Sequence, residues 1–411
     1  MQCNSSGWSS TDRAKDFGIV SYDWSNAKRE WAVQKPMDCE ERLLKQAEMT
    51  KNVSKQTHVF VYRNLVKALP WFASVREKLL DPRYGDWFVR FNGNGNYTVP
   101  ACAAENSSKC SAFYHDQEQT PEVPTSKNPS PDGSCDGECD CGEGLPCGEY
   151  IFDHRNGTML RNWIVEEMFL SPFGLGSDAI DGFFTDDYWC SNLICEETEN
   201  RTAGCPCNDP TQGPTEIDKH FQDDTGLSDE DIRDMTIAWN ATMHAVERAI
   251  LQRGGYSWWL MKNQQNANAM PIMLSATNAT ECTRVMRDAC TIGASTHEQP
   301  TLYGMSVKNG TILARPVFDL AFFLLARGPY AWIGYGIWGM TWPFNPEPAH
   351  GELPPLPHGV PFPDILRVDH GEPIDRYCSE TSEGVFERRW TNAHVNLDCT
   401  TGHANITTAH E

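Results

Sequence analysis

The chain has 411 residues, of which 40% are hydrophobic and 11% aromatic, so one decorated domain with a buried core is the default expectation. Its formal charge of -22 would repel phosphate backbones and anionic lipid headgroups, and we expect neither nucleic acid nor a membrane surface as a partner. No run of about 18 apolar residues is present, so no membrane span is expected.

Strand-like and helix-like patterns alternate along most of the chain. Six apolar runs have the character of strands: residues 17–22, 58–62, 150–152, 180–185, 256–261 and 331–336. Helical patterns cover residues 38–51, 72–80, 158–169, 228–252 and 312–327, and Ser228 is a good N-cap. This alternation predicts parallel βα units in an α/β fold, a (β/α)8-type TIM barrel of which six strands are clear.

Two stretches rich in Pro, Gly, Ser, Asn and Cys interrupt the alternation, at about residues 92–148 and 190–226. We interpret them as Cys-rich loop insertions within a barrel domain over residues 1–370. Residues 371–411 then form a small C-terminal β appendage, a hairpin packed on the barrel. We predict a disulfide between Cys378 and Cys399, which lie on either side of that hairpin.

Cysteines and glycosylation signals predict a secreted or extracellular glycoprotein. The sixteen cysteines form an even set, as expected where thiols oxidise in pairs. We predict N-linked glycans at eight Asn-X-Ser/Thr acceptors: Asn52, Asn96, Asn106, Asn200, Asn240, Asn278, Asn309 and Asn405. The polar start Met1-Gln2-Cys3-Asn4 is not a signal peptide, so this expectation requires a leader upstream of it.

Polar side chains follow the predicted strands, where the loops of a parallel barrel converge over one mouth. Carboxylates for acid and base, Arg and Asn for hydroxyl groups, and aromatic faces for a sugar ring together suit sugar chemistry. The catalytic candidates are Asp153, Asp186 and Asp187, because cleavage of a glycosidic bond normally needs two carboxylates with different proton affinities. The substrate-binding candidates are Asp23, Arg63, Asn64, Arg155, Lys262, Asn263, Tyr335 and Trp338. Strand-end aspartates also cap helices or bind arginines, and this structural role stays open for all of them.

No cofactor is expected, since no nucleotide-binding loop is present. The absence of a Gly-X-Ser-X-Gly elbow argues separately against a Ser-His-Asp hydrolase. The cysteine spacing at residues 135–147 does not match a zinc site and favours a disulfide knot. The acidic residues interleaved there leave a structural calcium ion as an alternative.

Several motifs resemble a known family. They are Y-I-F-D-H-R-N at 150–156, I-D-G-F-F-T-D-D-Y-W at 180–189, the aromatic run 330–342, G-E-P at 371–373 and G-V-F-E-R-R-W at 384–390. The chain is similar over about residues 17–400 to barrel-shaped glycosyl hydrolase-like proteins of microbial eukaryotes and bacteria. The resemblance implies an extracellular hydrolase-like protein that acts on a polysaccharide or glycan through strand-end carboxylates. The alternative is a non-catalytic carbohydrate-binding or structural glycoprotein on the same barrel.

Overall fold

The computed structural model describes residues 7–90, 141–145, 147, 150–187, 225–259, 272–273, 278–292, 295–298, 300–305, 307–308, 312–335 and 364–408. The chain divides into two compact units. The N-terminal unit comprises residues 2–265 with 347–353, and the C-terminal unit comprises residues 266–346 with 354–411. The predicted insertions at 92–148 and 190–226 lie almost entirely outside the described residues.

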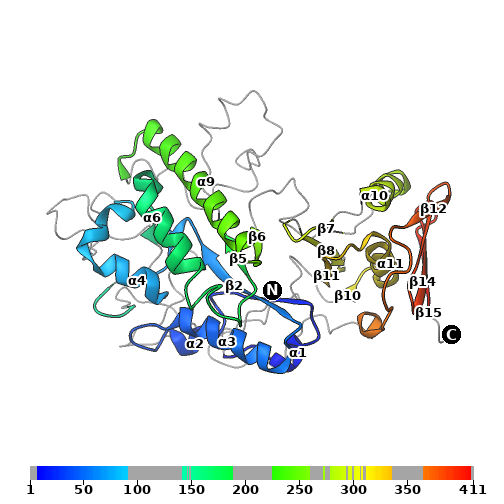
Figure 1. Ribbon diagram of the computed structural model, residues 1–411, viewed down its shortest axis with the longest axis horizontal. Coiled ribbons are helices and arrows are strands. Elements are labelled where there is room, and N and C mark those ends of the chain that lie inside the picture. The colour runs from blue at the N-terminus through cyan, green and yellow to red at the C-terminus, as the bar shows by residue number, and fades with distance from the viewer. Residues whose placement is uncertain are drawn as a thin grey trace. The chain divides into compact units, whose positions relative to one another are not determined.

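A parallel sheet forms the core of the N-terminal unit (Figure 1). Its four strands are adjacent in chain order: β1 (Ile19–Tyr22), β2 (His58–Asn64), β5 (Gly182–Asp186) and β6 (Tyr256–Trp259). Helix α1 (Thr11–Ala14) precedes β1, and the helices between the strands are α2 (Lys28–Trp31), α3 (Cys39–Val53), α4 (Ala73–Leu80), α6 (Gly157–Trp163) and α9 (Asp229–Gln252). Shorter helical segments are η1 (Pro82–Trp87), η3 (His154–Asn156) and the π-helix η4 (Ile164–Phe169). These four strands were all predicted.

The two faces of this sheet differ because successive strand residues point to opposite sides. One face carries a row of aromatic contacts, with ring centroids 5.9 Å apart for Tyr62 and Phe184 and 4.9 Å apart for Phe184 and Trp258. The other face meets the helices, where Tyr22 shares a hydrogen bond of 2.7 Å with Thr50 of α3. The longest helix, α9, begins with a capping box at Ser228, as the sequence predicts.

The predicted strand at residues 150–152 is not part of the parallel sheet. Only Tyr150–Ile151 form a strand, β4, and it pairs antiparallel with β3 (Lys67–Ala68). The chain turns back after β2, because the Asn64 side chain accepts hydrogen bonds from the backbone of Val66 and Lys67, and β3 then presents an edge to β4. Because β4 pairs with β3, it adds no strand to the parallel sheet.

The C-terminal unit contains a second parallel sheet and an antiparallel one. The parallel sheet has the order β11 (Ala331–Tyr335), β8 (Thr301–Met305), β7 (Ile272–Met273), and neither β7 nor β8 was predicted. A short antiparallel pair joins β9 (Val307–Lys308) to β10 (Ile312–Leu313), and the helices are α10 (Ala279–Ile292), α11 (Pro316–Ala326) and the 3-10 helix η8 (Asp364–Arg367). The helix predicted over 312–327 therefore begins later, at Pro316, whose fixed φ suits a first helical position.

The predicted C-terminal hairpin is the centre of a four-stranded antiparallel meander. Its strands are β12 (Ser379–Ser382), β13 (Val385–Arg389), β14 (Ala393–Asp398) and β15 (His403–Thr408). The buried helix α11 packs on β14 and β15 and shares a core with them. The structure therefore divides near residue 265 and not at the predicted boundary of 370, because the meander is one folded unit with α10 and α11.

The predicted disulfide between Cys378 and Cys399 is wrong. Both cysteines bond to α10 instead, in the pairs Cys282–Cys399 and Cys290–Cys378. The two α10 cysteines lie about two turns apart, so both can reach the meander that packs beside the helix. A third disulfide joins Cys141 to Cys147.

One cysteine departs from the expectation that all are paired. Among the described cysteines, Cys39 is buried and free, and its thiol donates to the Trp24 carbonyl at 3.3 Å.

The described strands form a mixed α/β fold without a closed barrel. Within each parallel sheet the strands follow one another in chain order, as they do in a (β/α)8 barrel, yet the two sheets are separate. No described helix is long and apolar enough to cross a membrane.

Candidate functional site

Three neighbouring strands end in polar side chains at one edge of the N-terminal sheet. The register pairs Asn64 of β2 with Asp186 of β5, and Asp23 follows the last residue of β1. We use the term strand-end cluster for Asp23, Tyr62, Asn64, Lys67, Asp186 and Asp187. The sequence predicted that Asp23, Asn64, Asp186 and Asp187 lie at a common edge, and the parallel order of β1, β2 and β5 brings them there.

Asp187 leaves the strand in a left-handed conformation, with φ of 58°. A non-glycine residue rarely adopts this conformation, although aspartate tolerates it better than most. The turn ends the strict alternation of the strand, and the Asp187 carboxylate then accepts a hydrogen bond of 2.6 Å from the Asn64 amide. The Asp187 backbone N–H donates to Oδ1 of Asp186 at 2.9 Å. Both carboxylates thus belong to one cluster.

Asn64 organises the cluster. Its Oδ1 accepts from the backbone of Val66 and Lys67 at 2.8 and 2.7 Å, and its Nδ2 donates to the Tyr62 hydroxyl at 2.9 Å and to Asp187. These four bonds use the full hydrogen-bonding capacity of an amide side chain. Asn64 therefore positions Asp187 and Tyr62 and has no bond left for a substrate, which corrects its predicted binding role.

Lys67 supplies the positive charge of the cluster. Its side chain is buried, and Nζ lies 3.6 Å from Oδ2 of Asp187. The ammonium group compensates part of the negative charge of the aspartates, which lie where water has little access.

The electrostatics separate Asp186 from an ordinary surface carboxylate. Burial raises the pKa of Asp186 well above its usual range, the charges of Asp187 and Asp23 raise it further, and Lys67 opposes them. Burial also raises the pKa of Asp23, although hydrogen bonds from Ser25 act in the opposite direction and lower it. A raised pKa favours the protonated form of a carboxyl group, and a protonated Asp186 can donate its proton to a substrate.

Tyr62 completes the polar end of the aromatic face. Burial raises the pKa of its hydroxyl well above the usual range, and the neighbouring charges of Asp186, Asp187 and Asp23 act in the same direction. The phenol therefore stays neutral and can donate a hydrogen bond into the cluster.

A pair of tryptophan rings begins at the residue that follows Asp23 in the chain. Trp24 follows Asp23 directly, is partly exposed, and has its ring centroid 5.0 Å from that of Trp71. The Lys28 ammonium lies 4.9 Å from the Trp24 ring centroid. Aromatic faces beside carboxylates are typical of sites that bind the apolar side of a sugar ring.

Arg63 does not belong to the site, although the sequence predicted a binding role. The side chain is fully buried on the helix-facing side of the sheet, since it alternates with Tyr62 and Asn64. Its guanidinium lies 3.2 Å from the Glu40 carboxylate and donates to the carbonyls of Tyr62, Met168 and Phe173. Arg63 therefore has a structural role: it ties β2 to α3, to η4 and to the segment that follows η4.

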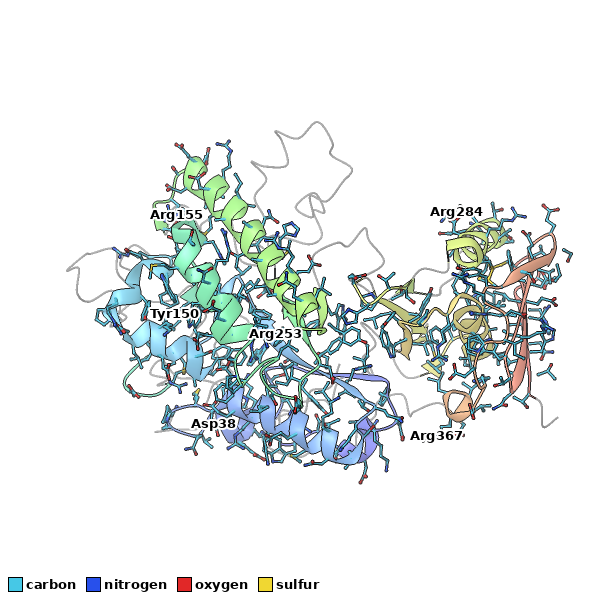
Figure 2. The ribbon with its side chains drawn as sticks, viewed as in Figure 1. Asp38, Tyr150, Arg155, Arg253, Arg284 and Arg367 are labelled. Carbon is cyan, nitrogen blue, oxygen red and sulfur yellow. A yellow bond between two sulfur atoms is a disulfide. The ribbon has the colours of Figure 1, made fainter. Side chains whose placement is uncertain are left out.

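Asp153 and Arg155 bind each other, which corrects both predicted roles. Two hydrogen bonds of 3.0 and 2.6 Å join the Arg155 guanidinium to the Asp153 carboxylate, and the same guanidinium bonds to Asp231 in the first turn of α9. Figure 2 labels Arg155 near the start of that helix. The Asp153 side chain also caps η3, so it fulfils the structural role that the sequence left open.

The remaining predicted residues are not brought to the strand-end cluster by any described contact. Lys262, Asn263 and Trp338 lie outside the described residues, as does the side chain of Tyr335 at the end of β11. Of the predicted glycosylation sites, Asn96, Asn106, Asn200 and Asn309 also lie outside them. Asn52, Asn278 and Asn405 are exposed and Asn240 is partly buried, and glycans at these positions stay a prediction.

Sequence reasoning missed Tyr62, Lys67 and Asp231. The sequence could have indicated Lys67, because it is the one charged residue in the apolar run from 65 to 72. Such a residue is buried only with a partner, here Asp187. In the part of the chain that the structure describes, no group of three or more His, Cys, Asp or Glu side chains is arranged to hold a metal ion.

Comparisons with known proteins add little. No protein-family model and no curated protein matches the chain. A sucrose 6F-phosphate phosphorylase from Thermoanaerobacter thermosaccharolyticum is similar at 9% identity and a TM-score of 0.37, over 96% of this chain and 89% of that one. A debranching enzyme of Nostoc punctiforme is similar at 11% identity and a TM-score of 0.33, over 94% of this chain and 75% of that one. TM-scores this low carry no argument about fold or activity.

Proposed function

We propose that the chain is an extracellular glycoside hydrolase-like protein that acts on a polysaccharide or glycan at the strand-end cluster. The observation that carries the proposal is the pairing of two unlike carboxylates. Burial and neighbouring charges raise the pKa of Asp186, whereas Asp187 has the Asn64 amide and the Lys67 ammonium as partners. Two carboxylates in different environments are what glycosidic bond cleavage needs.

In this proposal, Asp186 is the general acid. Its carboxyl proton passes to the glycosidic oxygen while the bond between that oxygen and the anomeric carbon breaks, so the leaving sugar departs as a neutral alcohol. The Asp187 carboxylate supplies the negative charge that stabilises the positive charge at the anomeric carbon. Water then adds to that carbon and loses a proton, which restores the acid.

Asp23 and Asn64 act through these two residues. The charge of Asp23 is one of the causes that raise the pKa of Asp186, so Asp23 helps to keep the acid protonated. Asn64 fixes the Asp187 carboxylate through a hydrogen bond of 2.6 Å. The extracellular location rests on the three described disulfides and the ten Asn-X-Ser/Thr signals of the sequence.

The test is hydrolysis of a broad panel of polysaccharides and chromogenic glycosides by the wild type, Asp186→Asn and Asp187→Asn. Asp153→Asn is the matched control, because Asp153 also follows a short strand but binds Arg155. We expect activity in the wild type and the control, and a loss of about 100-fold or more in both cluster variants. Binding of a glycan without turnover by the wild type would instead support a non-catalytic carbohydrate-binding glycoprotein.

A further inference from the structure

A polar pocket lies within the C-terminal unit. It has a volume of about 580 Å³, which is in the range of small-molecule sites. It opens between the end of α11, the loop before the meander, and the end of β13. Charged residues in its lining are Arg327, Arg376, Arg388 and Glu372, so cations dominate it in a chain whose formal charge is -22.

One of the three arginines has a structural role. Arg388 is 4% exposed, and its guanidinium donates to the carbonyls of Leu324, Leu325 and Arg327, the last turn of α11 and its cap. It also donates to the carbonyls of Asp375 and Arg376. Since each nitrogen of its guanidinium already donates to a backbone carbonyl, Arg388 fixes the pocket wall, and ligand recognition falls to the other arginines.

Arg327 and Arg376 have unused donors. Among the described residues, neither guanidinium has a hydrogen-bond acceptor or an ion pair; each contacts aromatic rings instead. Arg327 lies 5.5 Å from the Trp390 ring centroid and Arg376 lies 5.1 Å from that of Tyr377. Arginine presents a planar fork that matches a carboxylate, so two such forks at one pocket favour an anionic ligand.

Other parts of the lining limit what that ligand is. Glu372 would repel a compact dianion, but its carboxylate accepts hydrogen bonds from hydroxyl groups. Tyr377 and the two prolines of the lining, Pro329 and Pro373, offer apolar surface for a ring. In addition, the indole N–H of Trp390 is buried without a hydrogen-bond partner in the described structure.

We propose that this pocket binds an acidic sugar, with the carboxylate of a uronate on Arg327 and Arg376 and a sugar hydroxyl on Glu372. The pocket is distinct from the strand-end cluster and lies wholly within the C-terminal unit. The choice of a sugar over another hydroxylated carboxylate rests on the proposed function, whereas the anionic character rests on the arginines alone.

The experiment is titration calorimetry of the full chain with galacturonate and glucuronate, and with galactose and glucose as neutral counterparts. The variants are Arg327→Gln and Arg376→Gln. The matched control is Arg284→Gln, an exposed arginine of α10 in the same unit, which pairs with Asp288 (Figure 2). We expect uronates to bind at least about tenfold more tightly than neutral sugars, and each pocket variant to weaken uronate binding by at least about tenfold.

Three results would overturn the proposal: no uronate binding, equal affinity for neutral sugars, or equal losses in the pocket variants and the control. Equal affinity for lactate, a hydroxylated carboxylate without a sugar ring, would overturn the sugar assignment. Asp186→Asn is expected to keep uronate binding, so failure of the hydrolase proposal and failure of this one are distinguishable.

Discussion

Replacement of Arg63 by methionine separates a structural role from a binding role at the strand end. Arg63 and Glu40 are both fully buried, and the variant leaves the Glu40 carboxylate with the backbone N–H of Ser74 as its remaining described partner. Breaking one partner of a buried ion pair costs about 3–5 kcal/mol. For a unit of this size, each kcal/mol shifts the melting temperature by about 2–4 °C, so we expect a decrease of about 6–20 °C.

The assay is calorimetric unfolding, with two comparison variants. Arg253→Met changes an exposed arginine after α9 in the same unit, and we expect a change within about 0.5 kcal/mol (Figure 2). A double variant, Arg63→Met with Glu40→Leu, removes both charges and should recover much of the lost stability. The reasoning is refuted if Arg63→Met melts like the wild type while it loses affinity for a glycan.

Three further predictions concern stability. Because the folded-state pKa of Asp186 is raised, its contribution to folding is present at low pH and is lost as pH rises above the ordinary carboxyl pKa of about 4. At pH 8, Asp186→Asn should therefore unfold at a higher denaturant concentration than the wild type. Equal unfolding midpoints of the two proteins at pH 8 would contradict this. Peptide mapping without reduction should recover Cys282 bonded to Cys399, and a Cys399 peptide bonded to another cysteine would contradict the fold. Replacement of both cysteines by serine should lower the free energy of unfolding by about 2–5 kcal/mol. Arg388→Gln leaves the last carbonyls of α11 without donors and should cost about 3 kcal/mol in denaturant unfolding of the C-terminal unit, unlike Arg284→Gln.

The sequence predicted the part of the site that follows from strand order. Apolar runs that end in Asp23, Asn64 and Asp186 identify parallel strands, and parallel strands place their carboxyl ends at one edge. Binding roles were harder, because the two faces of a strand look alike in sequence until their partners are known. Arg63 is adjacent to Asn64 in the chain, yet its side chain points to the helices and forms an ion pair with Glu40.

Other errors arose where long-range pairing decides the outcome. The run at 150–152 looks like its neighbours, but the turn made by Asn64 presents an edge at β3, and β4 pairs there. Disulfide connectivity cannot be deduced from spacing: Cys378 is the cysteine nearest to Cys399 along the chain, yet Cys399 bonds to Cys282 of α10. The left-handed turn at Asp187 has no signal in the residues around it.

The role of Asp186 as a proton donor is tested most directly by the leaving group of the substrate. A nitrophenolate departs without protonation, whereas the alcohol of a natural glycosidic bond does not. If Asp186 is the acid, Asp186→Asn should lose about 100-fold or more in kcat/KM on an unactivated glycoside but keep most of its activity on the dinitrophenyl glycoside of the same sugar. Equal losses on both substrates would contradict the assignment of Asp186 as the acid.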